Sequence, residues 1–376
     1  MTSNRREFIK AGALGAAALS TGMLGAPSPA AARTDHKPLD ILVLGGTGFI
    51  GPHMVREALR RGHSVTLFNR GRTDAGAFPD LETIKGDRNN GLDGLEGRQW
   101  DVVIDNSGYV PRHVRDSARL LAPNVAHYVF VSTVSVYADF TSDAPESAPL
   151  ATIADETVEQ VTGETYGALK ALCEKAVMQE VGAERTTVLR PTYICGPGDR
   201  TDRFTWWPVR ASRGGEMLWP GQPGDHIQII DVHDLALFTV DCVEQKIAGT
   251  FNTATPESGY TMGELLADCR AVTAAEVQDI WVDEAFAIAA SANAPVRNHG
   301  AFPVWHPQRG PDAMGAQFIA HAAREAGMQT RPVRETIRGL LGWWATLPEE
   351  RTSKLQAGLP AEYEAELIAR WKKQQG

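Results

Sequence analysis

The sequence has few cysteines, and their spacing argues against two common kinds of site. Cys173, Cys195, Cys242 and Cys269 are far apart, with no CxxC pair and no histidine at metal-ligand spacing. We therefore predict no metal site and no dithiol redox motif, and expect buried free thiols. An oxidising destination would permit disulfides, but the sequence alone does not imply any.

Long hydrophobic runs and an excess of positive charge are also missing. The formal net charge is −9, and no segment after residue 32 is apolar for long enough to span a bilayer. Acidic proteins repel polyanions, so nucleic acid binding is not expected. Stable membrane insertion is not expected either, because no spanning segment is present. The chain has 376 residues and is 43% hydrophobic, which is enough to build a globular core.

The first 32 residues have a different character from the rest. Arg5 and Arg6 lie in NRREFIK, before a mildly apolar stretch over residues 11–24 and small residues at 30–32. This order is typical of a twin-arginine signal peptide, so we expect recognition by that export machinery and a periplasmic or extracellular destination. Cleavage would remove three cations and one anion and change the net charge from −9 to −11.

After a polar linker, predicted strands and helices alternate. Residues 39–44 form an apolar run stopped by glycine, and residues 51–61 have apolar side chains at helical spacing. The alternation continues with strands at 64–68, 82–85, 101–104, 127–131 and 186–189, and helices at 112–121 and 165–177. It predicts an α/β fold with a doubly wound, parallel Rossmann sheet.

From Tyr193 onward the alternation gives way to Gly- and Pro-rich loops. We expect a Rossmann domain over residues 38–193, with a returning segment at 226–254 that holds strands at 227–230 and 249–252. An interleaved substrate lobe over 194–348 and a helical tail over 349–376 would complete the chain. Thr261 and Glu264 form a capping-box pattern for a helix that runs towards Val272. The tail should pack on the lobe or on a partner, and the sequence is compatible with a homodimer.

The segment GGTGFIG, Gly45 to Gly51, lies where the first strand becomes the first helix. Glycines at this spacing let the chain turn tightly and bring backbone N–H groups and the helix N-terminus against a pyrophosphate. In this context the motif predicts a bound dinucleotide, NAD or NADP. The expected contacts from the turn are Gly45, Thr47, Gly48, Phe49 and Ile50.

The second strand lacks the acidic residue that NAD-preferring enzymes place at its end. Asn69-Arg70-Gly71-Arg72 stands there instead, and two guanidiniums without a carboxylate favour NADP slightly. Solvated surface arginines would look the same, so NAD stays open. Asp87, after the third strand, is expected either to accept a hydrogen bond from adenine or to cap a turn. Ser107, after the fourth strand, is expected near the nicotinamide ribose.

Tyr166 and Lys170 in YGALK lie four residues apart, on one face of a helix. A phenol with a pKa near 10 needs a neighbouring cation to act as a base at neutral pH, and Lys170 would supply one. Ser132 and Thr133 end the fifth strand, where a hydroxyl can hold a substrate oxygen beside the phenol or simply cap a turn.

These motifs together resemble those of extended short-chain dehydrogenases/reductases, in the NAD-dependent epimerase/dehydratase family. The resemblance extends over almost the whole chain after the signal peptide and includes GGTGFIG, VSTVSVY, YGALK, RPTYICGPGD and IIDVHDLA. It implies that Tyr166 is the general acid/base, that Lys170 also binds the nicotinamide ribose, and that Thr133, four residues before Tyr137, is the third catalytic group. Tyr193, in the turn after the sixth strand, is a further expected cofactor contact.

One departure from the family pattern is informative. Members that eliminate water from nucleotide sugars carry an Asp-Glu pair directly after the strand-end hydroxyl, whereas this chain has Val134 and Ser135. A dehydratase mechanism is therefore not expected. The substrate contacts expected from the lobe are Arg203, Trp206, Trp207, Arg210, Trp219 and Gln228. Aromatic faces and guanidiniums suit a sugar or an anion, although the tryptophans would equally fill a core.

The expected function is hydride transfer at a carbinol or ketone carbon of a small, sugar-like substrate. An epimerase and a simple NADP-dependent dehydrogenase or reductase of a non-sugar substrate need the same residues. An exported enzyme has no free dinucleotide pool, so we expect tightly bound cofactor and a closed redox cycle. A non-catalytic nucleotide- or RNA-binding protein is the alternative class, because plastid RNA-binding relatives share an FNRG-like end of the second strand. The Tyr/Lys pair, the acidic charge and the export signal count against it.

Overall fold

The computed structural model describes residues 37–74, 76–296, 299–310 and 313–376. The signal peptide expected at residues 1–32 lies outside the described residues. Residues 38–376 form one compact unit. No helix within the described ranges has both the length and the apolar character needed to cross a bilayer.

Seven parallel strands of the described chain form the main sheet, in the order β10-β6-β5-β4-β1-β2-β3. Their bounds are β1 Asp40–Leu44, β2 Ser64–Asn69, β3 Thr83–Lys85, β4 Val102–Asp105, β5 His127–Val131, β6 Thr186–Pro191 and β10 Gly249–Thr253. The strand order reverses between β1 and β4, which is where open α/β sheets bind their ligands. The doubly wound sheet predicted from the sequence is confirmed.

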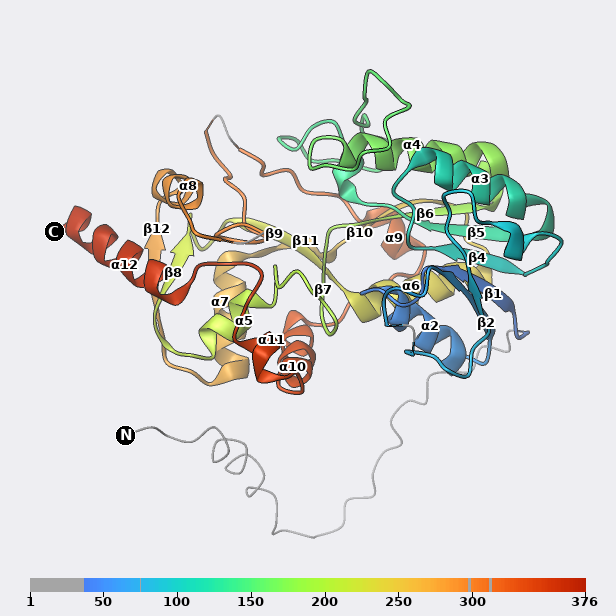
Figure 1. Ribbon diagram of the computed structural model, residues 1–376. Helices are drawn as coiled ribbons and strands as arrows, with labels where there is room; N and C mark the ends of the chain where they lie inside the picture. The colour runs from blue at the N-terminus through green and yellow to red at the C-terminus, as the bar shows by residue number, and fades with distance from the viewer. Residues whose placement is uncertain (1–36, 75, 297–298, 311–312) are drawn as a thin grey trace, which may run out of the picture. The chain divides into compact units, whose positions relative to one another are not determined.

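Helices cover both faces of this sheet (Figure 1). The helices α2 (Gly51–Arg60) and α6 (Val232–Gln245) pack on one face, and α3 (Pro111–Leu121) and α4 (Tyr166–Val181) on the other. In β1, Ile41 and Val43 join the core under α2 and α6, whereas Leu42 and Leu44 join the core under α3 and α4. Burial on both faces explains why this strand is an unbroken apolar run.

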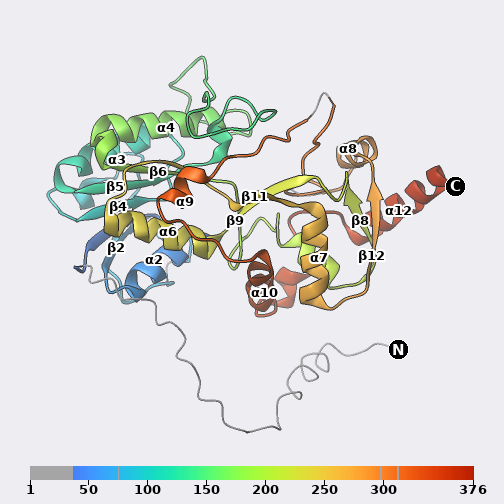
Figure 2. The same cartoon turned by 180° about the vertical axis from the view of Figure 1, so that it is seen from behind.

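The rest of the chain builds a lobe beyond the carboxyl ends of the strands (Figures 1 and 2). Its strands are β7 Tyr193–Cys195, β9 His226–Asp231 and β11 Thr255–Thr261 in one sheet, and β8 Gly215–Pro220 with β12 Val277–Val282 in another. Its helices are α5 Trp206–Ala211, α7 Met262–Thr273, α8 Glu284–Ala292, α10 Val333–Trp344, α11 Glu349–Thr352 and α12 Ala361–Gln375. The short α9, His321–Glu325, packs instead beside β10.

The structure departs from the sequence expectations mainly in this lobe. The segment expected to be loops contains α5 and β8, because their large apolar side chains form a core of their own. In the returning segment, β10 joins the main sheet and α6 packs on α2, but β9 pairs with β7 and β11. In the tail, Leu367 and Ile368 of α12 belong to the lobe core, so the tail is part of the lobe. The expected capping box at Thr261 and Glu264 begins α7.

Candidate active site

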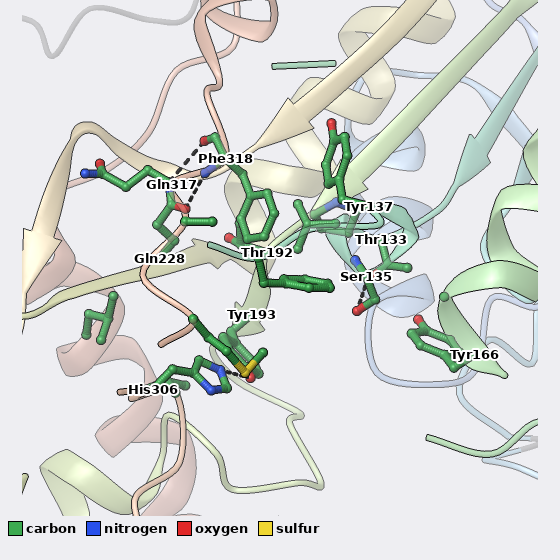
Figure 3. Close-up of a pocket in the computed structure, with 18 of the residues that line it drawn as sticks. Thr133, Ser135, Tyr137, Tyr166, Thr192, Tyr193, Gln228, His306, Gln317 and Phe318 are labelled. Atoms are coloured by element: carbon green, nitrogen blue, oxygen red, sulfur yellow. Dashed lines mark hydrogen bonds between the residues drawn. The ribbon is translucent and has the colours of Figure 1, made fainter. Parts of the chain in front are cut away.

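A pocket of about 690 Å³ opens where β5 and β6 end and the lobe begins. It brings together residues that are far apart in the sequence: hydroxyl groups after β5, the first turn of α4 and the first residues of the lobe (Figure 3). Of the predicted site residues, it is lined by Ser132, Thr133, Tyr166, Tyr193, Arg203 and Gln228. Lys170 is buried directly behind this lining.

A cluster of hydroxyl groups forms one end of the pocket. Thr133 caps the 3-10 turn η3 (Val134–Val136): its Oγ1 accepts a hydrogen bond from the Ser135 N–H at 3.1 Å and donates to Ser135 Oγ at 3.2 Å (Figure 3). Ser132 Oγ is buried and has no hydrogen-bond partner among the described residues. An unpaired buried hydroxyl in a pocket wall is suited to bind a ligand oxygen.

Tyr166 is the first residue of α4 and lies beside this cluster. Burial, assisted by the neighbouring Tyr109, raises the pKa of the Tyr166 phenol to about 12, although hydrogen bonding to Thr133 and the charge of Arg203 lower it. The rings of Tyr109 and Tyr166 are 6.4 Å apart. The phenol therefore carries its proton at neutral pH and can act as an acid.

Lys170 lies one helical turn after Tyr166 and is only 3% exposed. Its Nζ donates to the carbonyl oxygens of Gly108 at 2.7 Å and Val131 at 2.8 Å, which fixes the ammonium between the ends of β4 and β5. Burial lowers the Lys170 pKa to about 8. The two members of the YxxxK pair thus have pKa values shifted in opposite directions by burial, which is common at active sites.

Gly167 is a site residue that the sequence interpretation missed. A Cβ at this position would lie 2.1 Å from the carbonyl oxygen of Ser135, so any side chain would push α4 away from η3. The glycine is what lets the Tyr166 helix approach the Thr133 turn. Its place directly after the tyrosine in YGALK was the available signal.

The β1–α2 turn has the geometry that a dinucleotide needs. Gly45 and Gly46 have φ values of 115° and 91°, and a Cβ at Gly51 would lie 2.5 Å from the Gly46 Cα. By contrast, a Cβ at Gly48 would meet nothing within 4 Å. The turn therefore packs tightly on the helix and leaves open space beside its backbone, close to the N-terminus of α2, where a pyrophosphate is favoured. Thr47, Phe49 and Ile50 lie in the same turn.

Asn106 is a second residue that the sequence interpretation missed. It follows β4, where Asp105 is fixed by hydrogen bonds from Arg88 and Tyr128. Its side chain contacts Gly45, and its Nδ2 is buried without a hydrogen-bond partner among the described residues. A buried, unpaired amide next to the glycine turn fits a hydrogen bond to the cofactor.

The other predicted cofactor residues occupy different kinds of position. Asn69 Oδ1 accepts from the Gly71 N–H, and Asp87 Oδ1 accepts from the Asn89 N–H, so both side chains cap turns. Ser107 Oγ donates to the Leu44 carbonyl and ties β4 to β1 just before the glycine turn. Arg70 and Arg72 are exposed, with no partner among the described residues. Tyr193 lies on the lobe side of the pocket, where its hydroxyl hydrogen-bonds to His306 Nε2 at 2.8 Å.

The structure corrects the expectation that the lobe tryptophans and Arg210 line the pocket. Trp206, Trp207 and Trp219 are at most 1% exposed and stack edge to face or tilted in the lobe core. The indole N–H of Trp207 donates to the Pro303 carbonyl, and Arg210 forms a buried ion pair with Glu364 of α12. These side chains hold the lobe together, while Arg203 and Gln228 face the pocket.

Comparison with known proteins agrees with this geometry. The model of the NAD-dependent epimerase/dehydratase family matches residues 41–105, from β1 through the glycine turn to the end of β4. The similarity to this family model therefore lies in the segment from β1 to β4. Thr133, Tyr166 and Lys170 lie outside the matched segment.

The curated relatives of this chain differ in what their names describe. The chain is 28% identical over 212 residues to the Arabidopsis thaliana chloroplast stem-loop binding protein of 41 kDa b, covering 52% of this chain and 53% of the relative. It is 30% identical over 179 residues to a 3-beta-hydroxysteroid dehydrogenase of Mycolicibacterium neoaurum, covering 43% and 49%. The chain thus spans about half the length of these relatives.

Solved structures extend the likeness in fold over most of the chain. WbmG of Bordetella bronchiseptica, in complex with NAD and UDP, matches with a TM-score of 0.60 and 16% identity, covering 86% of this chain and all of WbmG. The UDP-glucuronic acid 4-epimerase of Bacillus cereus, in complex with NAD, matches with a TM-score of 0.58 and 14% identity, covering 81% and 98%. At this identity the likeness shows a shared fold.

Proposed function

We propose that this protein is an NAD(P)-dependent oxidoreductase that transfers hydride at a carbinol or ketone carbon. One observation carries the proposal: Tyr166, Thr133 and Lys170 converge at one end of the pocket. Lys170 is tied to Gly108, and Ser107 is tied to Leu44 next to the glycine turn. The acid/base residues and the glycine turn are therefore connected through two strand ends at the switch point of the sheet.

The residues have distinct roles in this reaction. A bound nicotinamide supplies reversible acceptance of hydride. In the reducing direction the Tyr166 phenol gives its proton to the substrate carbonyl oxygen, and in the oxidising direction its phenolate takes the carbinol proton. Thr133 and Ser132 hold that oxygen beside the phenol, and the Lys170 ammonium stabilises the phenolate.

Substitution of the phenol tests this proposal. We expect Tyr166→Phe to lower kcat by about 100-fold to 10,000-fold, the usual contribution of a general acid/base. Cofactor affinity should stay unchanged, because the ring still fills its site. Tyr363→Phe, which removes a lobe hydroxyl bonded to the Ala290 carbonyl, is the matched control. Wild-type turnover by the Tyr166→Phe variant would contradict the proposal.

Epimerisation of a sugar-like substrate is the second candidate. It is supported by the solved UDP-sugar enzymes that share the fold and by a pocket of about 690 Å³, within the range that holds a small ligand. A role in RNA binding is suggested by the name of the stem-loop binding relative. The net charge of −9 argues against it, because a polyanion would be repelled.

We also propose export by the twin-arginine pathway with NADP retained in the protein. The support is the Arg5-Arg6 pattern, together with the exposed Arg70 and Arg72 after β2, which are suited to a 2′-phosphate. Native mass spectrometry of the protein from the exported fraction should show one NADP per chain and would also report a homodimer. Finding the protein in the cytoplasm, or free of dinucleotide, would contradict this proposal.

A further inference from the structure

Three polar side chains in the wall of the pocket opposite Tyr166 are paired within the protein: Gln228, Tyr193 and His306. Gln228 Nε2 donates to the Phe318 carbonyl at 3.1 Å, and Gln228 Oε1 accepts from the Phe318 N–H at 2.7 Å (Figure 3). Tyr193 and His306 hydrogen-bond to each other and stack at 5.9 Å between ring centroids. A sugar is recognised by several convergent free donors and acceptors, and these three paired side chains do not supply them, although the buried His226 Nδ1 in the same lining has no partner among the described residues.

The same wall presents apolar surface to the cavity. The Phe318 ring stacks on Tyr137 at 5.6 Å and meets Phe140 edge to face at 6.0 Å, and Met314 also lines the pocket. Backbone hydrogen bonds join residues 316–319 to residues 140–144 and fix this surface in place. An apolar ligand body would bury well against it.

Arg203 is the one cationic side chain, Lys or Arg, among the described residues that line the pocket. Its guanidinium lies 4.8 Å from the centroid of the Tyr193 ring, and its Nε donates to Thr201 Oγ1 at 3.1 Å. The two terminal nitrogens have no hydrogen-bond partner among the described residues, so they can bind a carboxylate through two parallel bonds. A nucleoside diphosphate would place two charged groups against this single guanidinium.

We propose that the pocket selects an amphipathic substrate with one carboxylate, bound by Arg203, and an apolar body that packs on Phe140, Met314 and Phe318. This inference rests on the proposed function, which places the reacting carbinol or ketone at Tyr166. A substrate held both at its carboxylate and at its reacting oxygen cannot easily rotate within the site to present the other face of its reacting carbon to the nicotinamide. The arrangement therefore favours a dehydrogenase or reductase over an epimerase.

Isothermal titration calorimetry with three probes tests the proposal without any turnover. Octanoate, 1-octanol and UDP-glucose are titrated into the purified protein saturated with NADP or NAD. We expect octanoate to bind at least tenfold more tightly than octanol and more tightly than UDP-glucose. No binding of octanoate, or tighter binding of UDP-glucose, would overturn the proposal.

Variants of the guanidinium locate the carboxylate. Arg203→Gln should lower octanoate affinity about tenfold or more and leave octanol affinity unchanged, and Arg203→Lys should restore part of the loss because it keeps the charge. Arg119→Gln removes an exposed guanidinium on α3 and should bind octanoate like the wild type. Equal octanoate affinity in all variants would overturn the assignment, and circular dichroism melting checks that each variant is folded. Failure of the redox function would instead appear as unchanged turnover in Tyr166→Phe, whatever the octanoate result.

Discussion

The two ends of the pocket use their polar groups in different ways. At the Tyr166 end, Ser132 Oγ is buried without a partner among the described residues, and burial shifts the pKa values of Tyr166 and Lys170 to about 12 and about 8. At the Phe318 end, the amide of Gln228 and the Tyr193–His306 pair are bonded within the protein. The first end is therefore built to exchange protons with a substrate, and the second to keep a fixed shape around it.

Among the substitutions that test this difference between the two ends, the largest loss of turnover is expected at Gly167. A methyl group there would overlap the Ser135 carbonyl and push Tyr166 away from Thr133, and a displacement near 1 Å lowers turnover about 100-fold. Gly167→Ala should therefore lose most of its kcat while its affinity for cofactor stays close to that of the wild type. Steady-state kinetics and cofactor titration measure both quantities.

Gly163→Ala is the matched control, because Gly163 also lines the pocket but a Cβ there would meet nothing within 4 Å. Equal turnover in the two alanine variants would show that close packing of α4 on η3 does not position the phenol.

The pH dependence sharpens the description of the Tyr166 end. Lys170 has the lower pKa, about 8, so the Tyr/Lys pair releases its first proton near that pH. The pair with one proton removed is shared between amine with phenol and ammonium with phenolate, and the second form is the base. Alcohol oxidation needs a base, so its kcat/KM should rise with pH and level off above about pH 8. Ketone reduction needs an acid, so its kcat/KM should fall above about pH 8. In Lys170→Met, the remaining group of the pair is the phenol, with a pKa of about 12. The kcat/KM of alcohol oxidation should therefore keep rising about tenfold per pH unit beyond pH 8.

Lys175→Met, at an exposed position on the same helix, should keep the wild-type profile. A plateau near pH 8 in Lys170→Met would show that another group titrates there.

The sequence was informative where motif and backbone geometry coincide. The glycine turn, the strand ends and the YxxxK spacing each constrain the main chain, so the sheet was predicted correctly, and Thr133 and Tyr166 line one pocket with Lys170 buried behind them. The lobe was less predictable, because a tryptophan suits a sugar site and a core equally, and only tertiary packing shows that Trp206 and Trp207 are buried. Asn106 was missed because an unpaired amide is recognised only when its surroundings are known.

The smallest expected effect concerns the Phe318 end. Gln228→Leu removes both hydrogen bonds to the Phe318 backbone, at about 1 kcal/mol each, so the free energy of unfolding should fall by about 2 kcal/mol. The wall should then lose its fixed shape while Tyr166 and Thr133 stay in place, so KM should rise several-fold with little change in kcat. Denaturant unfolding and steady-state kinetics measure these changes.

Gln317→Leu alters a neighbouring amide that also lines the pocket but leaves the Gln228 pairing intact, and it should behave like the wild type. A loss of kcat in Gln228→Leu as large as that in Gly167→Ala would mean that the two ends are not separate, and that the far wall also positions the reacting groups.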